Sequence, residues 1–361
     1  MSLPPLPRRR LLPAAALLLA ACAALGCFQA AATDGAAPAA EGAPGDYLFC
    51  FWNTENFFDD KVDGWKTTPD KGYDTWFAAD DGKAFRLKLE KLTEVLASLN
   101  DGKGPDILAL AEVETEHAAQ SLMGSLNKAV GKRAAPYQHL LMMNPHGGRN
   151  IATAILTRLP VEKDRTRLLG RRQRILEGHI TVNGHDLVVI ASHWTSRLRE
   201  PEGKVGRGHY ADAIYGRFRA MYKSNPDVDV LICGDFNDNP DDDSVVKHLH
   251  ATDDLDLVRR GGDPPSLYDL FAKRWARNNN EPGTHFHRGK WFIFDQIVLS
   301  PGMLRPQGWH WDENFPAQIV RKIADDKGRP LPFGNEKSRR RRGASDHFPV
   351  TVRLKVTGAT K

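Results

Sequence analysis

The fold is decided by the stretch from Val228 to Pro240, which reads VDVLICGDFNDNP. Its first half is β-branched and apolar, as in a buried strand. Its second half, from Gly234 onward, is made of Gly, Asp, Asn and Pro, which end strands and form tight turns. Residues two apart on extended backbone share a face, so we expect Asp235 and Asn237 to point into one cleft. The alternative is a polar turn in which both side chains bond to their own backbone.

The same change from apolar strand to polar residue recurs along the chain. A single polar residue at a strand end is usually a cap or a turn residue, but many of them on one rim of a sheet indicate a site. The residues at such boundaries are Asn53, Glu112, His193, Asp235, Asn237, Asp295, Asp346 and His347.

Strand-like and helix-like segments alternate between these boundaries. The Asn183–Gly184 pair joins two apolar segments, 174–182 and 185–191, and predicts a two-residue hairpin turn. Hairpins mixed with strand–helix alternation predict one α/β domain over about 46–356, with largely antiparallel sheets covered by helices. Apolar residues near a 3.6-residue period predict the helices. Helices are expected over 84–99, 117–130, 208–223 and 241–249, and further strands over 47–52, 106–111, 137–143, 151–157, 228–233, 295–300 and 348–356.

The composition is that of an ordinary soluble globular protein. The chain has 361 residues, of which 41% are hydrophobic and 26% charged. The formal net charge is +5, and Arg8, Arg9 and Arg10 supply three of these charges, so +5 minus 3 leaves +2 if that segment is removed. Overall charge is therefore a weak argument for nucleic acid, and local clusters must carry that interpretation.

The N-terminal segment predicts export. The basic residues 8–10 precede a Leu/Ala run over 11–21 that is too short to span a bilayer, which is a signal-peptide pattern over residues 1–27. The sequence Leu-Ala-Ala-Cys at 19–22 resembles a bacterial lipobox, so lipidated Cys22 would tether the protein to a membrane. The alternative is later cleavage, which gives a free periplasmic or extracellular protein. Residues 28–45, rich in Ala, Gly and Pro, are expected to be a flexible linker.

The cysteines predict neither a disulfide framework nor a zinc site. Cys22 and Cys27 fall in the export segment. Cys50 and Cys233 lie inside apolar strands, where a buried free thiol is the usual state. No CxxC or Cys/His spacing suggests a structural metal.

The polar residues at the strand ends suit metal-assisted attack of water on a phosphodiester. Oxygen ligands such as Glu112 and Asn53 suit a hard cation like Mg²⁺. His347 can act as a general acid or base, with Asp295 fixing its tautomer. Asp235 is placed to orient the attacking water. The side chains expected to donate hydrogen bonds to phosphate oxygens are Asn237 and His193.

These residues resemble the endonuclease/exonuclease/phosphatase superfamily, which includes pancreatic-type DNases, abasic-site endonucleases, inositol-polyphosphate phosphatases and neutral sphingomyelinases. The resemblance implies a four-layer αββα (DNase I-like) sandwich with the site at one edge of both sheets. It also implies dependence on Mg²⁺ or Mn²⁺, and hydrolysis without a covalent intermediate. The segments that carry it, in the family's order, are Asn53 after a strand, Leu-Ala-Glu-Val at 110–113, Gly-Asp-Phe-Asn at 234–237, Phe-Asp-Gln-Ile at 294–297 and Ser-Asp-His at 345–347.

The resemblance also implies a role for each matched residue. Glu112 and Asn53 would bind the metal, and Asp346 would lie at the metal or at the nucleophilic water. Asp235 would align the nucleophile, Asn237 and His193 would contact phosphate, and Asp295 would pair with His347. One feature departs from the DNase-like pattern: the strand over 151–157 offers no carboxylate to support His193. Arg197, in His-Trp-Thr-Ser-Arg, is a further candidate phosphate ligand.

The substrate is less well specified than the chemistry. Basic clusters at 171–174 and 337–342 favour an exported nuclease that cleaves DNA or RNA, although solvated basic loops are the alternative. The second hypothesis is a phosphodiesterase or phosphatase acting on lipid head groups or small phosphates, sphingomyelinase-like or inositol-phosphatase-like. A membrane-active enzyme would need an exposed aromatic hairpin, for which only the segment 61–80, with Trp65, Trp76 and Phe77, is a loose candidate.

The third hypothesis is a tethered binding module that kept the fold and lost the chemistry. Its signature would be gaps among the polar residues at the strand ends, and none is present. We expect a monomer without a protein partner.

Overall fold

The computed structural model describes residues 45–145, 148–170, 172–199, 201–277, 281–338 and 342–358. The predicted signal peptide and nearly all of the predicted linker lie outside these residues, as do Arg171 and residues 339–341 of the two basic clusters. Within the described ranges, no helix has both the length and the apolar character needed to cross a bilayer.

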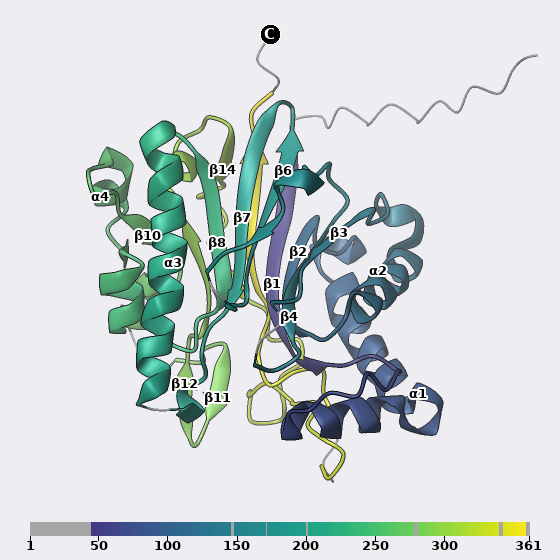
Figure 1. Ribbon diagram of the computed structural model, residues 1–361. Coiled ribbons are helices and arrows are strands. Elements are labelled where there is room, and N and C mark those ends of the chain that lie inside the picture. Colours follow the sequence, from purple (N-terminus) through teal and green to yellow (C-terminus); the bar gives the residue numbers. More distant parts are fainter. Residues whose placement is uncertain are drawn as a thin grey trace, which may run out of the picture. The chain divides into compact units, whose positions relative to one another are not determined.

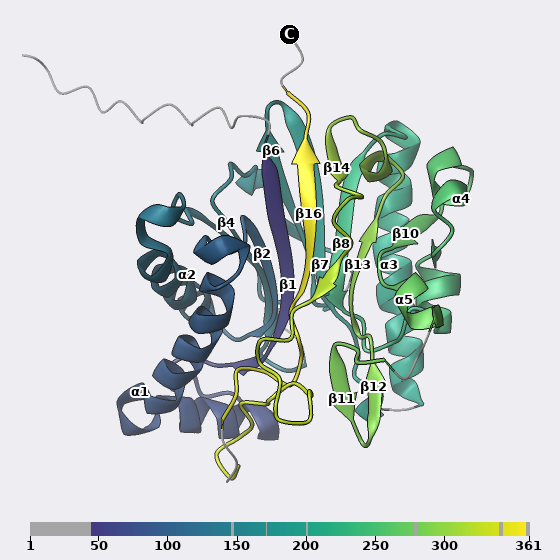
Figure 2. The same ribbon diagram turned by 180° about the vertical axis from the view of Figure 1, so that it is seen from behind.

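The first of two seven-stranded sheets is built around the N-terminal strand β1. β1 pairs in parallel with β2 on one side and antiparallel with β16, the last strand, on the other. Both chain ends of the domain therefore lie at the centre of one sheet (Figure 2). The strand order is β14 (Trp309–Trp311), β16 (Val350–Val356), β1 (Asp46–Phe57), β2 (Ile107–Val113), β4 (Ala152–Thr157) and β3 (His139–Met142), with β15 (Gln318–Ile319) also paired to β16.

The second sheet contains the strand with which the sequence analysis began. β8 runs parallel to β7 and antiparallel to β13, so it lies at the centre of this sheet. The strand order is β5 (Arg167–Leu168), β6 (Ile175–Val182), β7 (His185–His193), β8 (Asp229–Asp235), β13 (Asp295–Leu299), β10 (Leu267–Asp269) and β9 (Ala251–Thr252). A separate two-stranded hairpin is formed by β11 (His285–His287) and β12 (Lys290–Phe292).

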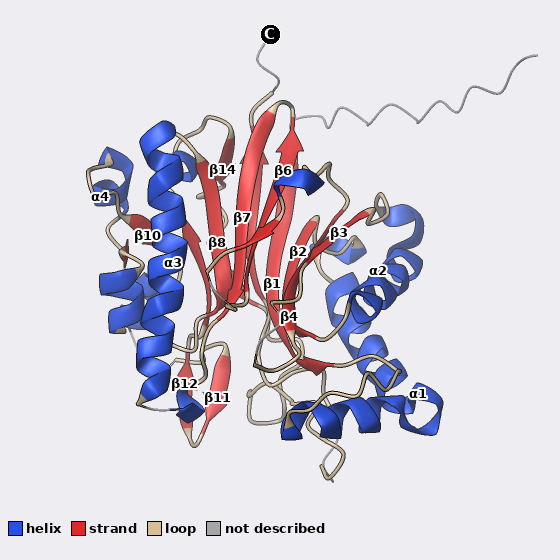
Figure 3. Cartoon of the chain, in the orientation of Figure 1, coloured by secondary structure: helices blue, strands red, loops and turns tan. Residues whose placement is uncertain are grey.

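The helices cover the outer faces of the two sheets (Figures 1 and 3). α1 and α2 share one apolar cluster with the first sheet, and α3 shares another with the second. A third cluster fills the space between the sheets. The predicted αββα sandwich is confirmed. The helices are α1 (Thr68–Ala97), α2 (Glu116–Val130), α3 (Glu202–Ser224), α4 (Leu255–Arg260) and α5 (Ala272–Arg277).

The central strands are apolar throughout because both of their faces are buried. In β1, Phe49 and Phe51 face the other sheet, while Cys50 and Trp52 face the helices. Cys50 and Cys233 are buried free thiols, as expected. This alternation determines which residues reach the site, because only one face of each strand points between the sheets.

Most element predictions are close, but several bounds need correction. β1 continues five residues past its expected end, to Phe57, and α3 begins six residues earlier than expected, at Glu202. The hairpin across Asn183–Gly184 is confirmed, with positive φ at both residues. The helix expected over 84–99 begins at Thr68 and is interrupted by non-helical backbone at residues 79–82. The segment 61–80 is therefore not an exposed aromatic loop, and Phe77 is fully buried. The expected helix over 241–249 is a single π-helical turn, Ser244–His248, and β7 extends two residues further than expected, to His193.

Candidate active site

Strand periodicity brings four polar residues to one end of the space between the sheets. Asn53 follows Phe49 and Phe51 on the inward face of β1. His193, Asp235 and Asp295 extend the inward faces of β7, β8 and β13 in the same way. In the second sheet His193 is in register with Asp235, and Asp235 with Asp295, so these three side chains form a row across adjacent strands. All four residues are at most 5% exposed.

Glu112 reaches the site through a change of backbone direction. Its even position in β2 would place it with Leu108 and Leu110, which pack against the helices. The register between β1 and β2 shifts at this point, and Glu112 has a φ of 62°. This left-handed conformation is uncommon for a residue other than glycine and often marks a functional position. It turns the Glu112 carboxylate toward Asn53, whose Nδ2 lies 3.4 Å from Oε1.

The loop that carries Asp346 and His347 is fastened to the end of β1. Ser345 Oγ donates to the carbonyl of Asn53 at 2.6 Å, and the backbone N–H of His347 donates back to Ser345 Oγ at 3.1 Å. Trp52 Nε1 donates to the carbonyl of His347 at 2.9 Å. These bonds hold the loop before β16 against β1 at Asn53, although the two segments are nearly 300 residues apart in sequence.

The carboxylates of Glu112 and Asp235 lie on either side of the Asn53 amide. Asn53 Nδ2 donates to Asp235 Oδ2 at 2.9 Å, while the backbone N–H of Asn56 donates to Glu112 Oε2 at 2.8 Å. The Glu112 side chain is 13% exposed, so this buried oxygen cluster opens to solvent. The two carboxylates, with room for water, offer the oxygen ligands that suit a hard divalent cation, whereas Asn53 turns Nδ2 toward them and its Oδ1 accepts the backbone N–H of Glu55 at 3.0 Å.

His347 and Asp295 form a buried pair. His347 Nδ1 lies 2.7 Å from Asp295 Oδ2, which leaves Nε2 directed toward Asp235 Oδ2 at 3.8 Å and Asp346 Oδ1 at 3.9 Å. Burial alone would lower the pKa of His347, but the negative charges of Asp295, Asp235 and Asp346 raise that pKa well above its usual value. His347 is therefore poised to hold a proton at Nε2 near neutral pH.

The pKa of His193 is shifted in the opposite direction to that of His347. Its Nε2 lies 3.6 Å from Glu112 Oε1 and 3.7 Å from Asp235 Oδ2, and its Nδ1 has no partner among the described residues. Burial, together with the nearby Arg174 charge, lowers the pKa of His193 to about 3. The ring is thus neutral at physiological pH. The missing carboxylate noted in the sequence is consistent with this unpartnered Nδ1.

Asn237 and Arg197 differ from expectation in their surroundings. The backbone turns at Asn237, which has a φ of 52°, and its N–H donates to Asp235 Oδ1 at 2.9 Å, as in the polar-turn alternative. The extended-backbone argument was therefore wrong, although the two residues do lie together. Arg197 bonds the carbonyl of Asn237 at 2.8 Å and pairs with Asp238 and Asp242. These contacts favour a role in holding the Asn237 turn over direct phosphate contact.

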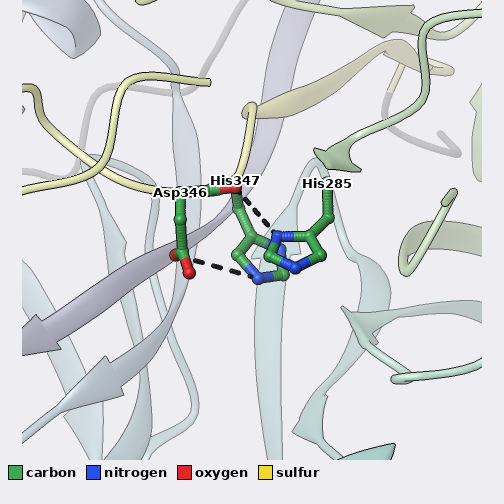
Figure 4. Close-up of side chains that lie close together, drawn as sticks. All are labelled: His285, Asp346 and His347. Carbon is green, nitrogen blue, oxygen red and sulfur yellow. Dashed lines mark hydrogen bonds and ion pairs between the residues drawn. The ribbon is translucent and has the colours of Figure 1, made fainter. Parts of the chain in front are cut away.

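His285 is a site residue that the sequence analysis missed. Its ring stacks on that of His347, with centroids 4.3 Å apart and planes at 26°, and its Nδ1 donates to the carbonyl of Asp346 at 2.9 Å. Figure 4 shows His285 and the Asp346 carboxylate on either side of His347. No sequence signal pointed to His285, because it lies in a three-residue strand that meets the loop before β16 through a single bridge, to His347.

The sequence of residues 48–356 matches the family described as endonuclease/exonuclease/phosphatase. The chain belongs to this family. Its members are hydrolases that act on phosphodiester bonds, and dependence on a divalent metal is typical of them. A search of curated proteins gave no match.

Similar solved structures agree on the fold. TDP2 from Caenorhabditis elegans has a TM-score of 0.52 and 16% identity over 86% of this chain and 75% of its own. Beta toxin from Staphylococcus aureus, a mutant with bound magnesium ions, has a TM-score of 0.50 and 14% identity over 85% and 99%. Sphingomyelinase C from Streptomyces griseocarneus gives 0.50 and 14% over 87% and 100%. At these identities the similarity concerns the fold alone.

Proposed function

We propose that this protein is an exported, metal-dependent nuclease that hydrolyses phosphodiester bonds of DNA or RNA by direct attack of water. The observation that carries the hydrolytic chemistry is the His347–Asp295 pair, which aims Nε2 of His347 at the carboxylate of Asp235. Export, by a lipidated Cys22 or by free secretion, rests on the sequence of residues 1–27 alone.

The metal site would use the oxygen cluster around Asn53. The carboxylates that would hold Mg²⁺ or Mn²⁺ are those of Glu112 and Asp346, and Asn53 would join them once its amide turns Oδ1, which now accepts the N–H of Glu55, toward the cation. When bound, such a cation stabilises the negative charge that develops on the phosphate. The fold-level similarity to a beta toxin with bound magnesium ions is consistent with this assignment.

The remaining residues handle protons and hold the phosphate. Asp235, buried and adjacent to His347, orients the attacking water. The raised pKa of His347 suits it to donate its Nε2 proton to the leaving oxygen. Asn237 uses one amide hydrogen on the carbonyl of Trp194, at 3.3 Å, which leaves the other for a phosphate oxygen. Neutral His193 donates through Nε2 in the same region.

The choice of nucleic acid over lipid rests on the β11–β12 hairpin. The aromatic rings of Phe286 and Trp291 pack against each other with centroids 5.0 Å apart, and Trp291 stacks on Phe348. Phe286 and Trp291 are partly buried and Phe348 is fully buried, so none of the three is among the exposed large apolar side chains. The exposed tip carries Arg288 and Lys290 instead. A basic tip suits a polyanion, whereas entry into a bilayer needs exposed apolar rings.

A substrate panel tests this choice. The full-length protein with Mg²⁺ is compared on plasmid DNA, single-stranded RNA, sphingomyelin vesicles and inositol phosphates. The proposal expects kcat/KM for at least one nucleic acid to exceed that for both other classes by at least about a hundredfold. Preferential hydrolysis of sphingomyelin or inositol phosphates would replace the nuclease by the lipid or small-phosphate alternative.

A further inference from the structure

The β11–β12 hairpin joins the site to an exposed cationic tip. It lies beside the loop segments at the end of the sandwich where β1 and β8 finish (Figures 1 and 2). The tip residues His287, Arg288, Gly289 and Lys290 are all exposed. Within the described part of the chain, Arg288 and Lys290 have no ion pair or hydrogen bond to a side chain, so both charges are available to a ligand.

The base of the hairpin is fixed to the site. Besides the stacking of His285 on His347, Thr284 Oγ1 accepts the backbone N–H groups of Phe294 and Asp295, at 3.1 and 3.2 Å. The N–H of Phe348 donates to the carbonyl of Thr284 at 2.8 Å. Thr284, just before β11, is thus bonded to the start of β13, which carries Asp295, and to the loop that carries His347, so the base of the hairpin is held against that pair.

The turn at the tip is well formed. Arg288 has a φ of 47° and Gly289 a φ of 82°, the two positive values of a type I′ turn, which matches the twist of a two-residue hairpin. Arg329 lies over the ring of Phe286, 5.4 Å from its centroid, and so holds one face of the hairpin. These contacts indicate an ordered arm with a fixed direction.

We infer that the β11–β12 hairpin is a nucleic-acid-binding arm, in which Arg288 and Lys290 contact backbone phosphates on one side of the bond that is cleaved. This inference rests on the proposed nuclease function and specifies how that site binds its substrate. Arg288 lies three positions after His285, which gives about 10 Å of extended backbone. At about 3.4 Å per nucleotide along one strand, the tip reaches a phosphate about three nucleotides from the cleaved bond.

The test compares a tip variant with a charge-matched control. Arg288→Asn with Lys290→Gln removes two charges and keeps the turn, because asparagine followed by glycine favours type I′. Lys128→Gln with Lys132→Gln removes two charges near the C-terminal end of α2, outside the site. The substrates are double-stranded oligonucleotides of increasing length and bis(p-nitrophenyl) phosphate, which is too small to reach the tip.

If the hairpin binds the nucleic-acid backbone, the tip variant should be impaired on long substrates and unimpaired on short ones. The tip variant should raise KM for long oligonucleotides about tenfold, lower the salt dependence of binding by about one unit per lost cation, and match the wild type on the small diester. The KM values of wild type and variant should become equal for oligonucleotides that extend less than about three nucleotides beyond the cleaved bond. Equal KM for the variant, the control and the wild type on long substrates would refute the arm while leaving the nuclease intact. Failure of the wild type to cleave any nucleic acid would instead refute the nuclease proposal.

Discussion

Nδ1 of His347 lies 2.7 Å from Oδ2 of Asp295, and both side chains are almost fully withdrawn from solvent. The second oxygen of Asp295 has no hydrogen-bond partner among the described residues. The carboxylate therefore interacts with one imidazole alone, and a charge-assisted hydrogen bond of this kind is stronger than a neutral one. It fixes which nitrogen of His347 faces the substrate.

Replacing Asp295 by Asn should separate this electrostatic role from packing. We expect kcat for bis(p-nitrophenyl) phosphate to fall by about a hundredfold or more, as for loss of general acid–base catalysis. The pKa of His347 should also fall, and because His347 acts in its protonated form, the basic limb of the pH–rate profile should move to lower pH. Asp269→Asn, at a buried carboxylate on β10, is the control and should retain both rate and profile. An Asp295→Asn enzyme with unchanged kcat and profile would exclude the pair from catalysis.

The strand-end residues could be predicted because strand geometry alone determines their direction. Asn53, His193, Asp235 and Asp295 each continue an inward-facing apolar row, so a period of two identifies them without knowledge of their neighbours. The α/β class followed for the same reason, since continuous apolar strands require burial on both faces, whereas the four-layer αββα arrangement was expected from the resemblance to the family.

The positions of Glu112 and His285 in the site could not be predicted from the periodicity of the sequence. The period of two would direct Glu112 toward the helices, and only a left-handed backbone angle next to a register shift turns it into the site. His285 depends on a long-range contact between a short hairpin and the loop that carries His347. The sequence made Arg197 a candidate phosphate ligand, but the turn after β8 supplies Asp238 and Asp242 as its ion-pair partners.

Glu112→Gln should weaken the metal site selectively. Because Glu112 supplies one of the carboxylates that would hold the cation, the Mg²⁺ concentration for half-maximal activity should rise about tenfold or more. Glu116→Gln, on the exposed first turn of α2, is the control and should have no such effect. The same Mg²⁺ requirement in the wild type and Glu112→Gln would place the metal elsewhere.

His193 should make the fold sensitive to acid. Its pKa is about 3 in the folded protein and about 6.5 when unfolded, so the unfolded state binds more protons between these values. Its contribution to stability is complete above about pH 6.5 and is lost as the pH falls toward 3. Urea unfolding of His193→Asn should therefore show a weaker fall in unfolding free energy over this window than the wild type. Parallel pH curves for the two proteins would show that His193 is not held neutral.

Lys88 should support the site from within α1. This fully buried side chain donates to the carbonyls of Glu55 and Ala344, at 3.0 and 2.7 Å, and so connects the end of β1 to the loop that carries His347. Lys88→Met leaves both carbonyls without their donor and should lower the unfolding free energy by about 1–3 kcal/mol. Lys91→Met removes only an exposed pair with Glu94 and should change it by less than about 1 kcal/mol. Equal losses in the two variants would contradict this role.

The most direct measurement is nicking of supercoiled plasmid by the full-length protein, with Mg²⁺ or with EDTA, beside His347→Gln and the exposed-histidine control His209→Gln. We predict nicking by the wild type and His209→Gln in Mg²⁺, none in EDTA, and a rate at least about a hundredfold lower for His347→Gln. Plasmid left intact by folded wild-type protein in Mg²⁺, or cut equally fast by His347→Gln, would contradict a metal-dependent nuclease that acts through His347.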